Sequence, residues 1–251
     1  MPLLSAFWMS SGNGRSLRSN DPRCPAVVLV HGAWSDGSCW SDVISRLHAR
    51  GVSVVSVQNP LSSLRDDVAA VKRAFASCPG SIVLVGHSWG GTVISAAGVD
   101  EKVQALVFIS AFAPEPGDST NDVQSGFPQP EYLKVLRLEQ DGYLTFPQEL
   151  FPHYCAQDLP SINARVLAAV QGPIHGDAFN DRITVAAWTE KPSWYLITEK
   201  DRVIDPTLQQ EMAHRMHASI RKVSASHSPF ASRPKETANI IMEAVNNVRS
   251  R

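Results

Sequence analysis

The chain has 251 residues, of which 43% are hydrophobic and 19% are charged, and this composition excludes an intrinsically disordered chain. The 23 Lys and Arg residues nearly balance the 24 Asp and Glu residues, which leaves a formal net charge of -1. We therefore expect neither a nucleic acid nor a membrane surface as a partner.

Residues 1–24 lack the pattern of a helix or strand, and we interpret them as a flexible N-terminal extension. The stretch "MPLLSAFWMS" has no basic residue before its apolar part, which is unlike a signal peptide. No apolar run approaches the roughly 20 residues that span a bilayer. The four cysteines have no metal-ligand spacing, so we expect free thiols, a cytoplasmic location and no bound metal.

Apolar strands and amphipathic helices alternate after the extension. "PAVVLVHG" (25–32) and "VSVVSVQNP" (52–60) are typical of buried strands. Apolar residues at helical spacing predict a helix over 40–48, and a second one follows over 63–80 with its N-cap near Ser63.

The alternation continues with a strand over 81–86, a helix that begins at Ser88, and a strand over 103–110. These strands are apolar throughout instead of alternating with polar residues. That pattern is typical of a parallel sheet covered by helices on both faces, so we predict an α/β fold with a mostly parallel sheet.

The pattern breaks over residues 114–192, which contain many prolines and only short helical stretches such as "EYLKVLRL" and "SINARVLAAV". Strand-like runs return at "SWYLIT" and "SIRKVSAS". We therefore predict one α/β core formed by 25–113 and 193–251, with 114–192 inserted as a helical cap. Such insertions at the carboxyl ends of parallel strands are where these folds build binding sites.

A serine stands between glycines where the third strand gives way to its helix. Gly86-His87-Ser88-Trp89-Gly90 satisfies the G-x-S-x-G nucleophile motif in the required strand–turn–helix context. The tight turn strains the serine backbone, and the helix N-terminus favours developing negative charge. We therefore predict that Ser88 is a catalytic nucleophile.

A serine nucleophile needs a general base and an acid that orients the base, in the chain order serine, acid, histidine. His227 follows the last predicted strand, where the base is expected. For the acid we favour Asp201 over Glu199, which lies too close to its strand, and over Asp205, which resembles an N-cap before a proline. The alternative is that these acidic residues form only an exposed charge cluster.

An oxyanion hole needs two backbone N–H donors. We assign them to Trp89, which follows the nucleophile, and to Ala33, in the turn after the first strand. The side chains of Trp34 and Trp89 are expected near the mouth of the pocket. Trp34, Phe112 and Phe230 are candidate substrate contacts, although a buried aromatic residue is more often part of the core.

The sequence resembles the α/β-hydrolases, in the branch that contains small methylesterases and hydroxynitrile lyases. The matching stretches are "VLVHGAWSDGSCW", "VQNPLSSLRDDV", "VLVGHSWGGTVI", "LVFISAFAPEPG", "PSWYLITEKDRVI" and "SHSPFASRP". The resemblance implies an α/β-hydrolase fold with an inserted helical cap and no cofactor. It implies a triad of Ser88, Asp201 and His227, with the oxyanion bound by the N–H groups of Ala33 and Trp89.

Two positions depart from other members of that fold. Hydroxynitrile lyases of this branch carry a lysine directly after the histidine, where this chain has Ser228. Epoxide hydrolases and haloalkane dehalogenases use an aspartate at the position of Ser88. Both differences argue against those activities.

We therefore predict a serine hydrolase that cleaves a small carboxylic ester or lactone through an acyl-enzyme. Aromatic residues of the predicted cap indicate a mostly apolar pocket. One alternative uses the same triad for cofactor-free lyase, retro-aldol or oxygenase chemistry. The other is a ligand-binding protein with vestigial catalysis. The fold alone does not distinguish these functions.

Overall fold

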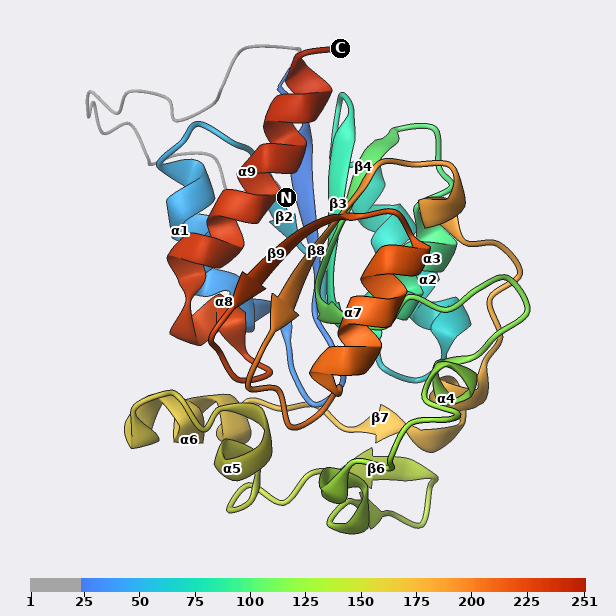
Figure 1. Cartoon of the computed structure of the whole chain (residues 1–251), viewed down its shortest axis with the longest axis vertical. Helices are drawn as coiled ribbons and strands as arrows, with labels where there is room; N and C mark the ends of the chain where they lie inside the picture. The colour runs from blue at the N-terminus through green and yellow to red at the C-terminus, as the bar shows by residue number, and fades with distance from the viewer. Residues whose placement is uncertain (1–23) are drawn as a thin grey trace, which may run out of the picture.

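A computed structural model describes residues 24–251 (Figure 1), so the predicted flexible extension lies almost entirely outside the described residues. Its central feature is a six-stranded, fully parallel sheet in the order β2-β1-β3-β4-β8-β9. This confirms the predicted parallel sheet. Its strands are β1 (Ala26–Val30), β2 (Val54–Ser56), β3 (Ile82–Ser88), β4 (Val103–Ala111), β8 (Ser193–Thr198) and β9 (Ser219–Val223).

Helices cover both faces of this sheet (Figure 1). One face carries α1 (Ser41–His48) and α9 (Pro234–Arg249), and the other carries α2 (Leu64–Phe75), α3 (Trp89–Ala97) and α7 (Pro206–Arg215). The short helix α8 (Pro229–Ser232) precedes α9.

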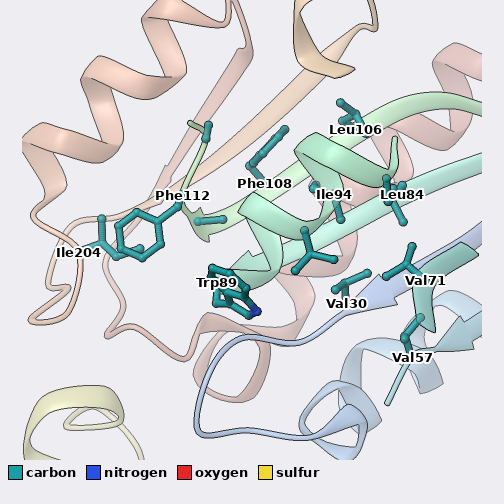
Figure 2. Close-up of a cluster of buried hydrophobic side chains, with 14 of the residues drawn as sticks. Val30, Val57, Val71, Leu84, Trp89, Ile94, Leu106, Phe108, Phe112 and Ile204 are labelled. Carbon is teal, nitrogen blue, oxygen red and sulfur yellow. The ribbon is translucent and has the colours of Figure 1, made fainter. Parts of the chain in front are cut away.

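Strand β1 illustrates why the strands are apolar at every position. Val28 and Val30 belong to the core cluster under α2, α3 and α7, part of which is drawn in Figure 2. Val27 and Leu29 belong to the cluster under α1 and α9. Successive side chains of a strand point to opposite faces, so a strand buried on both faces is apolar throughout.

The boundaries of several elements differ from the prediction. The Ser63 hydroxyl accepts a hydrogen bond from the Asp66 N–H and caps α2, as predicted, but the helix ends at Phe75, before the expected proline. Helix α3 begins at Trp89, with Ser88 as its N-cap residue.

Most of residues 114–192 lie at the carboxyl ends of the parallel strands, at the bottom of Figure 1, whereas residues 187–189 pack against α3 and lead back to the start of β8. "SINARVLAAV" forms α6, as predicted, whereas "EYLKVLRL" forms one 3-10 turn followed by a strand. The segment also contains a three-stranded antiparallel sheet, β5-β6-β7, that was not predicted. The elements within residues 114–192 are α4 (Thr120–Val123), η2 (Glu131–Lys134), β5 (Arg137–Leu138), β6 (Tyr143–Thr145), α5 (Phe151–Cys155), α6 (Ser161–Ala169), β7 (Ile174–His175), η3 (Gly176–Asn180) and η4 (Ala187–Thr189).

The sequence predicted free thiols and no membrane-spanning segment. All four cysteines lie among the described residues and are free thiols. Within residues 24–251, none of the helices has the length and apolar character needed to cross a bilayer.

Candidate active site

Ser88 lies in a sharp turn between β3 and α3. Its backbone has φ 52° and ψ -122°, a left-handed conformation that costs a non-glycine residue about 1–3 kcal/mol. A Cβ atom at Gly86 would lie 2.5 Å from the carbonyl oxygen of Gly90, and one at Gly90 would lie 2.6 Å from that of Val30. The flanking glycines are therefore required because strand and helix approach too closely for a side chain.

Asp201 and His227 are brought together from two different loops. The Nδ1–H of His227 donates to Oδ2 of Asp201 over 2.8 Å, and both residues are buried. This contact fixes the proton on Nδ1, so Nε2 of His227 is left as the acceptor. The pair therefore has the arrangement of a general base with its orienting carboxylate.

The carboxylate of Asp201 is held by four further donors. Thr198 Oγ1 and Gln209 Nε2 donate to its Oδ2 over 2.7 and 2.9 Å. The backbone N–H groups of Val203 and Ile204 donate to Oδ1 over 2.8 and 3.0 Å. Such charge-assisted bonds compensate for the loss of hydration of a buried carboxylate.

The two alternative acids have other environments. Glu199 is exposed, and its backbone N–H bonds to the end of β9. Asp205 accepts from the Thr207 N–H over 2.7 Å and is the N-cap of α7, as predicted. Asp201 is thus the acid of this cluster that contacts His227.

His87 braces the backbone of the candidate base. Its Nε2–H donates to the carbonyl oxygen of His227 over 2.8 Å, and the two imidazole rings lie 4.6 Å apart. Burial holds the pKa of His87 well below its usual value, so the ring is neutral at physiological pH. The ring of Phe230 packs against His87 edge-on at 4.9 Å. This brace keeps the loop of His227 against the nucleophile turn.

The Trp89 side chain does not lie at the pocket mouth, and that expectation is wrong. The indole is fully buried in the core (Figure 2), and its Nε1–H donates to Oδ2 of Asp67 over 2.7 Å. Burial raises the pKa of Asp67 to about 6. The Trp89 backbone N–H opens α3, where the first N–H groups have no partner within the helix, so it can serve as an oxyanion donor.

A cavity with about 430 Å³ of unfilled space, its open mouth included, lies beside two of the three predicted catalytic residues and is not lined by Asp201. Ser88 and His227 both line it, as do Ala33, Trp34 and Phe230. Among the described residues that line it, no Asp, Glu, Lys or Arg occurs. The cavity therefore presents a mostly apolar wall around Ser88 and His227.

Phe112 is the predicted substrate contact that the structure places elsewhere. Its side chain is buried in the core beside Ile204 (Figure 2) and does not line the cavity. The reason is backbone geometry, because the Phe112 N–H bonds to the carbonyl oxygen of Ser88 and fixes this residue behind the nucleophile turn.

Several residues of the cavity wall were not identified from the sequence. They are Ser35, His87, Cys155, Leu167, Val203 and Ser228, whereas Phe151 belongs to the aromatic residues of the cap that predicted an apolar pocket. Phe151 and Cys155 lie on α5 and Leu167 on α6. Their only signal was that the inserted segment is rich in aromatic and apolar residues.

Trp34 connects the core to the inserted segment. Its Nε1–H donates to the carbonyl oxygen of Leu144 in β6 over 2.9 Å, and its ring packs edge-on against Tyr132 and Phe146. Trp34 is therefore a buried wall of the cavity.

Within residues 24–251, no group of three or more His, Cys, Asp or Glu side chains is placed to hold a metal ion.

The model of the alpha/beta hydrolase family matches residues 27–240, which is most of the chain. The chain belongs to the alpha/beta hydrolase family. This assignment and the parallel sheet confirm the resemblance seen in the sequence.

Curated relatives of this α/β-hydrolase include hydrolases and esterases. It is 25% identical over 260 residues to a pyrethroid hydrolase of Sphingobium wenxiniae, covering 86% of each chain. It is 24% identical to methylesterase 2 of Arabidopsis thaliana, covering 91% of this chain and 99% of that protein.

Solved structures show the same fold. The pyrethroid hydrolase from Sphingobium faniae JZ-2 superposes with a TM-score of 0.76 at 21% identity, covering 88% of this chain and 97% of that chain. Polyneuridine aldehyde esterase gives a TM-score of 0.76 at 18% identity, covering 88% and 98%.

Proposed function

We propose that this protein is a serine hydrolase that cleaves small, uncharged carboxylic esters or lactones through an acyl-enzyme on Ser88. The observation that carries the proposal is the buried Asp201–His227 hydrogen bond beside a strained serine turn, within one cavity. A protein that only binds a ligand has no need for a base, its orienting acid and a strained serine in one place.

In the proposed mechanism, Nε2 of His227 accepts the proton of the Ser88 hydroxyl as its oxygen attacks the ester carbonyl. The N–H groups of Ala33 and Trp89 stabilise the oxyanion. Asp201 holds the imidazole in the required tautomer and stabilises its positive charge.

Collapse of the tetrahedral intermediate breaks the bond to the leaving oxygen, which takes the proton from His227 and departs as an alcohol. In a lactone this alcohol stays attached to the acyl group. Water then attacks the acyl-enzyme while His227 accepts one of its protons. The second collapse returns the proton to Ser88 and releases the carboxylic acid, so the enzyme ends in its starting state.

The character of the cavity supports the substrate class. Its lining holds no side chain that is permanently charged, and most of it is apolar. A substrate with a carboxylate or ammonium group would lose hydration without gaining an ionic partner. Two of the relatives are a pyrethroid hydrolase and a methylesterase, which agrees with ester substrates.

The proposal is tested by labelling with a fluorophosphonate, together with turnover of p-nitrophenyl esters of increasing acyl length. We expect labelling of the parent on Ser88 and turnover of short esters. Ser88→Ala should abolish labelling and lower turnover by about 10⁴-fold or more, while the melting temperature stays close to that of the parent. Near-parental turnover by folded Ser88→Ala would refute the mechanism.

A further inference from the structure

The loop that carries Asp201 is attached to α5 and to the residues just after it. Gln157 Nε2 donates to the carbonyl oxygen of Lys200 over 2.6 Å. Arg202 Nη1 donates to the carbonyl oxygen of His153 over 2.9 Å. These two bonds hold the residues on either side of Asp201.

The loop that carries His227 is attached to the same segment. Residues 224–228 form no helix or strand, so their backbone groups need partners from elsewhere. The N–H of Ser226, one residue before the base, donates to Oδ2 of Asp158 over 3.1 Å. A side chain of the inserted segment thus holds the backbone next to His227.

The Asp158 carboxylate occupies an unfavourable position. Its side chain is 14% exposed, its Oδ1 is buried without a hydrogen-bond partner, and the guanidinium of Arg233 stays 4.0 Å away from Oδ2. A carboxylate with this little hydration and only partial pairing costs free energy. Its hydrogen bond to the loop of His227 is the contact that compensates for this cost.

The same segment also supplies one wall of the cavity. Phe151 and Cys155 on α5 and Leu167 on α6 flank the linker that contains Gln157 and Asp158. One stretch of the inserted segment therefore both lines the cavity and holds the two loops that carry Asp201 and His227. Helices α5 and α6 lie together beneath the sheet in Figure 1.

We propose that Asp158 is a positioning residue for His227, and Gln157 a positioning residue for Asp201. The inference rests on the proposed function, because it concerns the alignment of the same triad. Misplacement of a reacting group by about 1 Å can reduce a rate by about 10²-fold, so loss of a contact next to the base lowers kcat before it affects KM.

The test compares Asp158→Ala, Asp158→Asn and the control Asp177→Ala. Asparagine keeps an oxygen that accepts from the Ser226 N–H, and alanine does not. Asp177 is a carboxylate of the inserted segment whose side chain is 86% exposed and makes no contact with the triad loops. We expect Asp158→Ala to lower kcat on p-nitrophenyl acetate about tenfold with KM changed less than about twofold. Asp158→Asn should stay within about threefold of the parent, and Asp177→Ala should be unchanged.

A second measurement needs no substrate. The proton between His227 Nδ1 and Asp201 is observed by downfield proton NMR. We expect its resonance to be sharp in the parent and in Asp158→Asn, and broadened in Asp158→Ala. If the parent failed to hydrolyse any ester, the proposed function would fall while this spectrum still tested the positioning role.

Two results would overturn the inference. One is Asp158→Ala behaving like Asp177→Ala in both measurements. The other is Asp158→Asn losing as much kcat as Asp158→Ala, which would assign the effect to charge instead of to the backbone contact. Should Asp158→Ala not fold, Gln157→Ala replaces it, with an expected loss of about threefold in kcat and the same broadening of the resonance.

Discussion

The two walls of the active-site cavity are built in different ways. The core wall consists of turns at the ends of parallel strands, and the carboxylate of Asp201 there accepts five hydrogen bonds, one of them from His227. The wall from residues 114–192 consists of short helices and apolar side chains that meet the core through a few polar contacts. Under the proposed function, we therefore expect the core wall to perform the chemistry and the inserted segment to select the substrate.

The largest expected effect comes from removing the acid of the core wall. Asp201→Asn should lower kcat about 10³-fold or more, because asparagine no longer fixes the tautomer of His227 or stabilises its positive charge. Steady-state kinetics on p-nitrophenyl acetate measure the loss. Glu199→Gln is the matched control, because Glu199 is exposed and does not contact the imidazole. Equal activity of the two variants would contradict the assignment of the acid.

Asp67 lies at the boundary between the two walls, and we expect it to make the stability of the protein depend on pH. Its carboxylate accepts from Trp89 behind the nucleophile and from the N–H of Leu61, whose carbonyl oxygen accepts from the N–H of His175 in β7. Burial raises its pKa from 3.8 to about 6. Between these pH values the folded state binds more protons than the unfolded state.

The free energy of unfolding therefore falls as pH rises from about 4 to about 6, and the contribution of Asp67 to this fall is roughly 3 kcal/mol. Asp67→Asn removes that contribution. Urea unfolding of both proteins at a series of pH values measures the difference between the two curves. Parallel curves across this window would show that the Asp67 pKa is not raised.

His87 should contribute to the rate through the backbone of His227. In His87→Phe the ring volume is similar, but the carbonyl oxygen of His227 loses its donor at 2.8 Å and keeps only the hydroxyl of Ser110 at 3.5 Å. Weaker pairing of this buried acceptor should shift the backbone of His227, so we expect kcat to fall about tenfold with little change in KM. His214→Phe, on the exposed surface of α7, is the control. An unchanged kcat in His87→Phe would contradict the bracing role.

The smallest expected effect, and the one confined to the inserted segment, is a change of substrate preference. Phe151→Ala enlarges the cavity, and one or two methylenes in an apolar pocket are worth about 1–3 kcal/mol. We expect the ratio of kcat/KM for hexanoyl over acetyl p-nitrophenyl ester to rise about fivefold, while kcat for the acetyl ester stays close to that of the parent. Leu138→Ala, at a side chain that is 72% exposed, should leave the ratio unchanged.

The core was predictable from the sequence because its signals are local. A strand buried on both faces is apolar at every position, and the turn at Ser88 needs glycines where strand and helix nearly touch, so residues 82–98 indicated the strand, the turn and the helix. The N-cap role of Asp205 was predictable for the same reason. Asp201 and His227 followed from their places after the last two strands.

The inserted segment was not predictable in the same detail because its contacts are between distant residues. Strands β5 and β7 have two residues each, too few for a periodic pattern. Gln157 and Asp158 bond to loops more than 40 positions away, and no local pattern marks them. Phe112 and Trp89 were placed wrongly because a sequence cannot say whether an aromatic ring beside the nucleophile turn faces the cavity or the core.

The most direct test of the account is mass spectrometry of protein quenched in acid during turnover of a slow p-nitrophenyl ester. If Ser88 is the nucleophile, the peptide spanning residues 82–98 gains the mass of the acyl group in the parent, and Ser88→Ala shows no such gain. Turnover with no acylated peptide in the parent and no loss of rate in folded Ser88→Ala would contradict it. That result would instead indicate that Asp201 and His227 serve a base-catalysed reaction that needs no covalent intermediate.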